Sequence, residues 1–135
     1  MEAEKQVKSA GRPLLREELQ RVFEQHERLW TRLNILDELS WNDFPWPMVK
    51  QPSNPDDMFP PEISAYIQSP FYSYKDKIRT RRDRIREHMK RWHPDRFETN
   101  LLPKVVEDER EKVKQGAGNV AGHLSALLRR EDDRG

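Results

Sequence analysis

A cluster of prolines near the middle of the chain limits most strongly how this sequence can fold. Six of the ten prolines fall between Pro45 and Pro61. Proline lacks the amide donor of a helix and keeps the residue before it out of the helical conformation, so no helix can run through this stretch. The same stretch contains the aromatic residues Trp41, Phe44, Trp46 and Phe59. We therefore expect segment 41–60 to be a strap laid over a core, in preference to a free linker.

Before the prolines, apolar residues recur in alternating steps of four and three. The stripe consists of Leu15, Leu19, Val22, His26, Leu29, Leu33 and Leu36, with the histidine as its one polar member. This spacing predicts an amphipathic segment, 13–40, with a helix over 13–39 that Pro13 can open. Residues 1–12 are polar and are expected to form a disordered leader. The stripe is compatible with packing inside the chain, with a partner helix and with weak self-association as a coiled coil.

After the prolines, the pattern predicts a helical unit over 61–130. Pro61 opens a short helix whose apolar residues share one face. Ser73 and Asp76 have the spacing of a capping box and are expected to start a second helix over 74–92. One side of that helix is a basic wall of Lys75, Lys77, Arg79, Arg81, Arg82, Arg84, Arg86, Lys90 and Arg91.

A loop over 93–103 is expected next, followed by a last helix over 104–129 and a frayed tail, 131–135. The buried stripe of the last helix is expected to be Val106, Val113, Ala117, Val120, Leu124 and Leu127. Its interior also contains Gly116, Gly118 and Gly122. Because glycine costs about 1 kcal/mol against alanine inside a helix, these glycines indicate a close backbone approach to a neighbour, with a helix kink as the alternative.

These patterns predict an all-α fold, with a long N-terminal helix, a short helix and two further helices. Hydrophobic residues make up 34% of the chain and charged residues 36%, so the core should be small. The absence of cysteine excludes disulfide staples and thiolate metal sites. We see no signal peptide and no apolar run long enough to span a membrane. A protein of the nucleus or cytoplasm is expected.

The stretch KIRTRRDRIREHMKRWHPDRF joins the basic helix directly to a His-Pro-Asp tripeptide. With a short helix before it and an apolar-striped helix after it, segment 61–130 resembles a J domain. The resemblance implies a J-domain-like hairpin in a non-catalytic interaction module of the cochaperone type, which docks on a heat-shock-70-class chaperone. The partner-binding residues that it implies are His93, Pro94 and Asp95, with Lys77, Arg81, Arg84 and Arg91 on the basic helix. Such a helix would meet an acidic protein surface with fast, salt-sensitive association.

The heptapeptide RWHPDRF also resembles the C-terminal region of the NF-kappa-B inhibitor-like protein 1 family, which implies a nuclear regulatory adaptor. After the tripeptide the chain has Arg96-Phe97-Glu98, where J domains usually have Lys-Asn-Pro. A second hypothesis is therefore a basic protein associated with nucleic acid or RNA processing, which keeps the J-like fold without chaperone activity. A solvated charged face with no partner is the plainest alternative.

No sequence pattern points to catalysis, a cofactor or a metal. Proline separates His93 from Asp95, and neither a nucleophile nor a glycine-rich loop lies near them in sequence. His88, His93 and His123 lack the close spacing of metal ligands. We therefore expect an interaction protein with no catalytic residues, no cofactor and no metal ligands.

Overall fold

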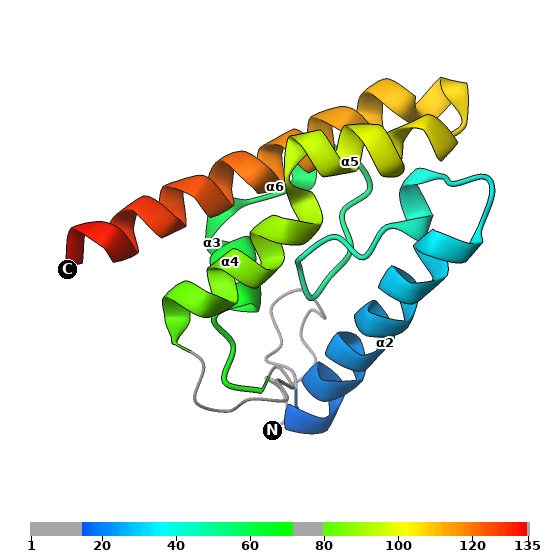
Figure 1. Ribbon diagram of the computed structural model, residues 1–135. Helices are drawn as coiled ribbons and strands as arrows, with labels where there is room; N and C mark the ends of the chain where they lie inside the picture. The colour runs from blue at the N-terminus through cyan, green and yellow to red at the C-terminus, as the bar shows by residue number, and fades with distance from the viewer. Residues whose placement is uncertain (1–14, 72–79, 135) are drawn as a thin grey trace.

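The computed structural model describes residues 15–71 and 80–134 (Figure 1). It has an all-α fold, as the sequence predicts, and the described residues form no β-strand. The α-helices are α2 (Arg16–Ile35), α3 (Pro60–Ile67), α4 (Arg81–Trp92), α5 (Pro94–Asn100) and α6 (Glu107–Arg134). Short 3-10 turns lie between them at η2 (Trp41–Asp43), η3 (Pro55–Asp57) and η4 (Leu102–Lys104).

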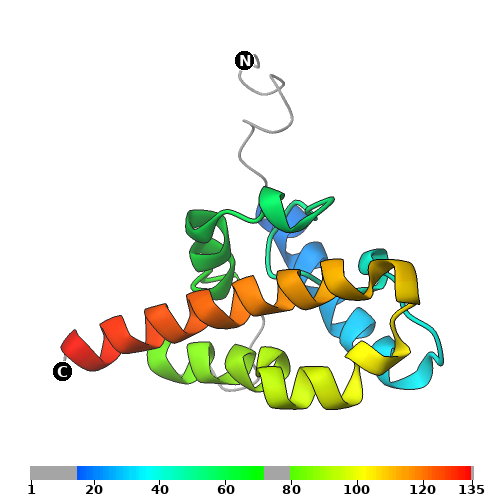
Figure 2. The same cartoon turned by 90° about the horizontal axis from the view of Figure 1, so that it is seen from above.

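The longest helix, α6, runs antiparallel to the rod formed by α4 and α5 (Figures 1 and 2). Ile85 on α4 and Val120 and Leu124 on α6 are completely buried where the two helices pack. The short helix α3 packs against both of them. The antiparallel helix pair expected from the sequence is therefore present.

Helix α2 is shorter than the predicted helix over 13–39. At its start, the Glu18 carboxylate accepts a hydrogen bond from the Leu15 amide at 2.8 Å. The helix ends at Ile35, and Leu36 is extended with a ψ of 142°. The prediction for the C-terminal end was therefore wrong by four residues.

A contact across the molecule explains why α2 stops early. Leu39 forms an isolated parallel bridge with Val105. The Leu39 amide donates to the Lys104 carbonyl, and the Leu39 carbonyl accepts from the Val106 amide, both at 2.9 Å. These backbone groups could not serve a helix at the same time. The end of α2 is thus joined to the start of α6.

The predicted boundaries of the two long C-terminal helices also need correction. Helix α4 begins at residue 81 and not near 74, because Thr80 is extended and its hydroxyl caps the helix by accepting from the Asp83 amide at 3.0 Å. The predicted capping box of 73–76 and the leader 1–12 lie outside the described residues. Helix α6 extends through residue 134, so the described part of the predicted tail 131–135 is helical.

The apolar stripe of α2 packs within the chain. Phe23, His26 and Leu33 are buried, whereas Leu15 at the start of the helix is 62% exposed. Phe23 and Leu33 belong to one hydrophobic cluster that also includes the strap and the later helices. The stripe is therefore part of the core of this molecule.

The proline-rich strap contributes its aromatic rings to that core. Trp41, Phe44 and Trp46 are each at most 2% exposed, while Phe59 is 53% exposed. The Trp41 indole N–H donates to the Pro52 carbonyl at 2.7 Å, so its polar atom is satisfied inside the core. The strap lies over the core through its tryptophans and Phe44, and Phe59 is the aromatic residue left outside.

Gly116 allows α6 to approach the strap. A Cβ at this position would lie 2.9 Å from the Trp41 ring and 3.0 Å from the Trp46 ring. The predicted close approach is thus confirmed for Gly116. It is wrong for Gly118 and Gly122, because a Cβ at either would meet nothing within 4 Å.

We expect Gly116→Ala to destabilise the protein by about 1–3 kcal/mol, because the added methyl group must displace two buried indole rings. Gly118→Ala is the matched control. Its methyl group enters open space, so the gain in helix propensity should stabilise the protein by up to about 1 kcal/mol. Urea unfolding measures both changes, and a shift of the same sign in the two variants would contradict the close approach.

Two histidines are buried in the core around Tyr66. His26 Nδ1 lies 2.6 Å from the Tyr66 hydroxyl, and its Nε2 lies 3.1 Å from the Gln51 amide nitrogen. Because that nitrogen only donates, Nε2 must accept, which fixes the neutral ring with its proton on Nδ1. The His88 and Tyr66 ring centroids are 6.0 Å apart. This polar cluster connects α2, the strap, α3 and α4.

Burial keeps both imidazoles neutral. Desolvation lowers the pKa of His26 to about 4, against a smaller opposing effect of Glu27. Desolvation also lowers the pKa of His88 to about 3, and the Arg91 charge acts in the same direction. Since both folded pKa values lie below the ordinary 6.5, the unfolded chain binds more protons at acid pH.

Stability should therefore be fully present above pH 6.5 and should fall as the pH drops from there toward the folded pKa values. The slope should approach about 1.4 kcal/mol per pH unit for each histidine. His26→Gln keeps hydrogen-bonding groups at the site and removes one titration, so it should lower the slope by the share of one histidine. Denaturant unfolding across this pH range measures it, and an unchanged slope in the variant would contradict the assignment.

Candidate docking surface

The His-Pro-Asp tripeptide lies at a junction between two helices. His93 ends α4 and also caps α5, with a φ of −57° and a ψ of 129°. Pro94 is the first residue of α5, where its missing amide costs nothing. The His93 Nδ1 accepts from the Asp95 amide at 3.2 Å, and all three residues are exposed. We call this exposed junction, residues 93–95, the HPD corner.

The predicted loop over 93–103 was wrong, because helix α5 and the turn η4 occupy most of it. The sequence contains a signal for the extra helix. Phe97 and Leu101 are four residues apart and both are buried, which is helical spacing. The Phe97 ring packs 5.6 Å from the Trp92 ring, measured between centroids. Proline at position 94 thus ends one helix and begins the next.

The basic residues implied by the J-domain resemblance do not form one free surface. Lys77 lies outside the described residues. Arg81 pairs with Glu131 of α6 at 3.5 Å, and Arg84 is half-buried. Arg91 pairs with Glu27 of α2. The neighbouring Arg82 forms a further ion pair with Asp132 of α6.

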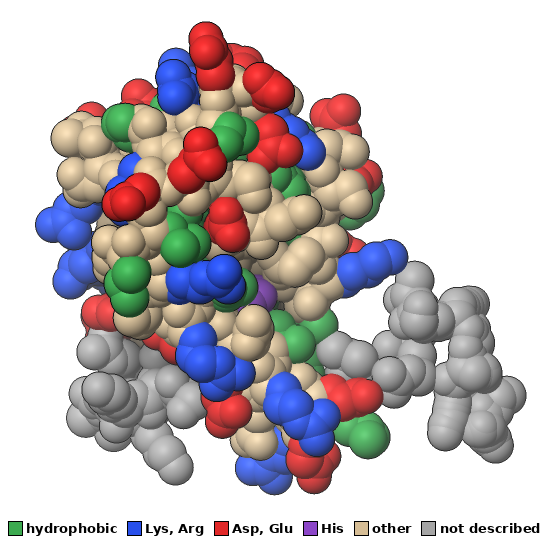
Figure 3. Space-filling model, turned by 90° about the vertical axis from the view of Figure 1, so that its right-hand side faces the viewer, with side chains coloured by type: hydrophobic (Ala, Val, Ile, Leu, Met, Phe, Trp, Pro, Cys, Tyr) green, Lys and Arg blue, Asp and Glu red, His purple; other side chains and the backbone are tan. Residues whose placement is uncertain are grey.

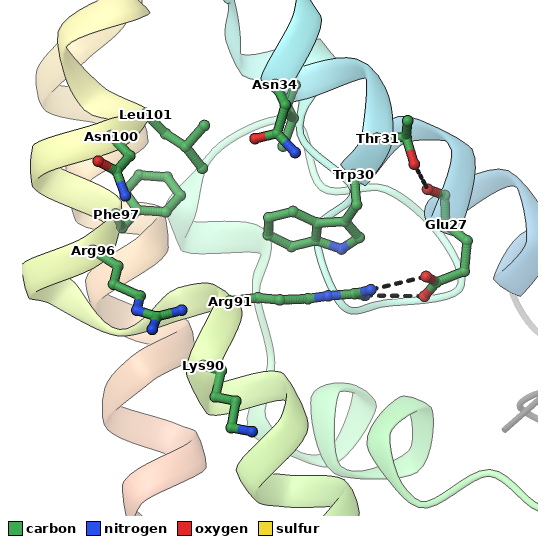
Figure 4. A pocket seen from close by; sticks show the side chains of 11 residues that line it. Glu27, Trp30, Thr31, Asn34, Lys90, Arg91, Arg96, Phe97, Asn100 and Leu101 are labelled. Atoms are coloured by element: carbon green, nitrogen blue, oxygen red, sulfur yellow. Dashed lines mark hydrogen bonds and ion pairs between the residues drawn. The ribbon is translucent and has the colours of Figure 1, made fainter. Parts of the chain in front are cut away.

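Arg91 joins α2 to α4 through two kinds of contact (Figure 4). Its Nη1 and Nη2 donate to the two carboxylate oxygens of Glu27 at 3.0 and 2.8 Å. Its guanidinium also lies 5.0 Å from the centre of the Trp30 ring. Trp30 in turn packs edge-on against Trp92, with centroids 5.0 Å apart. A bidentate pair with a stacked aromatic ring is a strong use of arginine that lysine cannot reproduce.

A groove lies beside this contact, between α2 and the rod of α4 and α5. Its volume is about 390 Å³, and Figure 4 shows residues of α2 facing residues of α4 and α5 across it. It is lined by Glu27, Trp30, Thr31, Leu33, Asn34, Lys90, Arg91, Arg96, Phe97, Asn100 and Leu101. We call it the α2–α5 groove. The HPD corner lies between Arg91 and Arg96 in sequence, but none of its three residues lines the groove.

Sequence reasoning did not single out the cations that remain available. Arg86, Lys90 and Arg96 are exposed, and within the described residues none of them has an ion-pair partner. On the face in Figure 3, acidic side chains gather mainly in the upper half, and Lys and Arg are mixed with acidic side chains in the lower half. In α4 and α5, the exposed positive charge without an ion-pair partner therefore comes from Arg86, Lys90 and Arg96.

The three histidines considered as metal ligands each make a different contact. His88 is buried beside Tyr66, and His93 caps α5. His123 Nε2 lies 2.9 Å from the Ser64 hydroxyl, which ties α6 to α3; burial lowers the pKa of His123. In the part of the chain that the structure describes, no three His, Cys, Asp or Glu side chains are grouped to hold a metal ion.

Comparison with protein-family models, curated proteins and solved structures finds no match for this chain. Within residues 15–71 and 80–134, no helix combines the length and the apolar character needed to cross a membrane.

We expect Arg91→Lys to destabilise the protein by about 1 kcal/mol, because lysine keeps the charge but loses the bidentate geometry and the stacking on Trp30. Arg82→Lys is the control. Arg82 and its partner Asp132 have side chains 45% and 47% exposed, so solvent screens the pair and no measurable change is expected. Thermal unfolding compares the two variants, and equal losses would contradict a special role for Arg91.

Proposed function

We propose that this protein is a non-catalytic interaction module of the J-domain type, which docks through its HPD corner on a heat-shock-70-class chaperone. The observation that supports the proposal most is the exposure of His93, Pro94 and Asp95 at the end of a basic helix. That helix packs antiparallel on the long helix α6. The resemblance of segment 61–130 to a J domain implies the same order of parts.

The local chemistry suits a rigid recognition corner. Pro94 fixes φ at the start of α5, and His93 is held by its hydrogen bond to the Asp95 amide. The imidazole and the carboxylate are therefore presented to solvent from a defined turn, and less conformational entropy is lost when a partner binds. Arg86, Lys90 and Arg96 add positive charge around the corner, which favours an acidic partner surface.

The docking surface that we propose differs from the one implied by the resemblance. Arg81 and Arg91 are engaged by Glu131 and Glu27, so they hold helices together. Arg86 and Lys90 replace them as the exposed cations of α4.

The alternative is a nuclear adaptor that binds nucleic acid through the basic helix. Arg81 and Arg91 already pair with Glu131 and Glu27 within the chain, which weakens a phosphate-binding stripe. The geometry therefore favours a protein partner. A gel shift with RNA or DNA that weakens steeply with salt is the result that would favour the alternative.

Single-turnover ATP hydrolysis by a heat-shock-70-class chaperone tests the proposal. We expect the full chain to accelerate hydrolysis, and His93→Gln to reduce the rate to that of the chaperone alone. His93→Asn should do the same, although asparagine is a good helix N-cap and preserves the start of α5. A loss of stimulation in His93→Asn would then reflect the lost imidazole and not the loss of the helix cap.

Glu98→Gln is the matched control, because Glu98 is exposed on α5 but does not belong to the HPD corner. It should stimulate hydrolysis as the unmodified chain does. Circular dichroism checks that all variants stay helical. Lack of stimulation by the unmodified chain, or full stimulation by both His93 variants, would reject the proposal.

A further inference from the structure

None of the three residues of the HPD corner lines the α2–α5 groove, so docking through the corner alone leaves the groove empty. We propose that this groove is a second docking site, which takes a short acidic segment of the partner protein with an apolar side chain between its carboxylates. The inference rests on the proposed docking function for the identity of the partner, and it concerns a surface that this function does not require.

The shape of the groove suits a side chain and not a large ligand. Its volume of about 390 Å³ lies near the lower end of the range of roughly 300–1,000 Å³ for ligand pockets. Leu33, Phe97 and Leu101 are buried beneath it, and Trp30 is half-buried at its side. An apolar side chain placed there would cover apolar atoms at the base of the groove.

The charges around the groove select an acidic ligand. Arg91 is already neutralised by Glu27, whereas Lys90 and Arg96 are exposed and have no ion-pair partner among the described residues. Both belong to the α4–α5 side of the groove in Figure 4. The net charge of the lining is therefore positive, and carboxylates would complement it.

The polar groups on the two sides can bind an extended backbone. Asn34 on α2 and Asn100 on α5 are exposed and line the groove. Each side-chain amide can both donate and accept, which matches the amides and carbonyls of a peptide. Figure 4 shows the Asn34 amide and the Asn100 amide on opposite sides of the groove.

Other anionic ligands fit less well. A free inorganic anion would leave the apolar base uncovered. A nucleotide base would need an open aromatic face for stacking, but the Arg91 guanidinium lies over the Trp30 ring and Trp92 packs against it. A peptide with an apolar side chain between two carboxylates would contact both the exposed cations and the apolar base of the groove.

Fluorescence anisotropy of a short labelled peptide made of glutamate, aspartate and leucine tests the proposal with the full chain. We expect saturable binding. The double variant Lys90→Glu, Arg96→Glu should weaken it about tenfold or more by charge reversal. Asn34→Trp should abolish it, because Asn34 is exposed on α2 and a larger side chain there fills the groove without entering the core.

The matched control is the double variant Lys114→Glu, Arg129→Glu. Both residues are exposed and neither lines the groove, while the change in net charge is the same. Its affinity should stay within about threefold of the unmodified chain, as expected for distant, screened charges. Equal weakening in the two double variants would overturn the proposal, because it would show general electrostatic attraction.

Competition separates the other possible occupants. An acidic peptide with serine in place of leucine, inorganic phosphate and an RNA oligonucleotide should each displace the probe poorly. Efficient displacement by any of them would overturn the peptide proposal in favour of that ligand.

The two proposals fail in different ways. His93→Asn should keep peptide binding while it loses chaperone stimulation. Peptide binding without any stimulation by the unmodified chain would reject the chaperone proposal and support the groove. Stimulation without peptide binding would support the chaperone proposal and reject the groove as a docking site.

Discussion

A stack of aromatic rings joins parts of the chain that belong to different elements. Its members are Trp41 and Trp46 of the strap, Trp92 at the end of α4 and Phe97 of α5, with successive ring centroids 4.3, 5.1 and 5.6 Å apart. All four rings are almost fully buried, and stacked or tilted pairs at such distances contribute beyond the area that they bury. The HPD corner lies between Trp92 and Phe97. Its orientation therefore depends on the Trp92 and Phe97 rings, and Trp46 of the strap packs against Trp92.

Periodicity and prolines were sufficient to predict the all-α fold and the strap, while the antiparallel helix pair was expected from the J-domain resemblance. They failed where a distant contact decides a local structure. Helix α2 ends early because Leu39 bonds to a segment some sixty residues away in sequence. The role of Arg91 was missed for the same reason, since Glu27 is its partner on another helix. The error after Pro94 had a different cause, because proline can both end one helix and begin the next. Only the spacing of Phe97 and Leu101 indicates that a helix, and not a loop, follows Pro94.

The basic helix α4 performs two tasks with the same residue types. Arg81, Arg82 and Arg91 pair with acids on α6 and α2 and so connect helices. Arg86 and Lys90 remain toward solvent, and Lys90 lines the α2–α5 groove. Charge composition alone cannot separate these tasks, because they depend on which side of the helix each residue occupies. The proposed docking surface is accordingly narrower than the basic wall of the sequence and is centred closer to α5.

Trp92 is contacted by two segments that precede residue 61, namely by Trp30 of α2 and Trp46 of the strap. A fragment cut at residue 61 to isolate the motif would remove both of these contacts with the indole and would leave Gly116 opposite an empty space. The smallest piece able to fold independently must then reach back to α2. The geometry of the tripeptide thus depends on segments outside residues 61–130. A fragment of those seventy residues alone would not keep it.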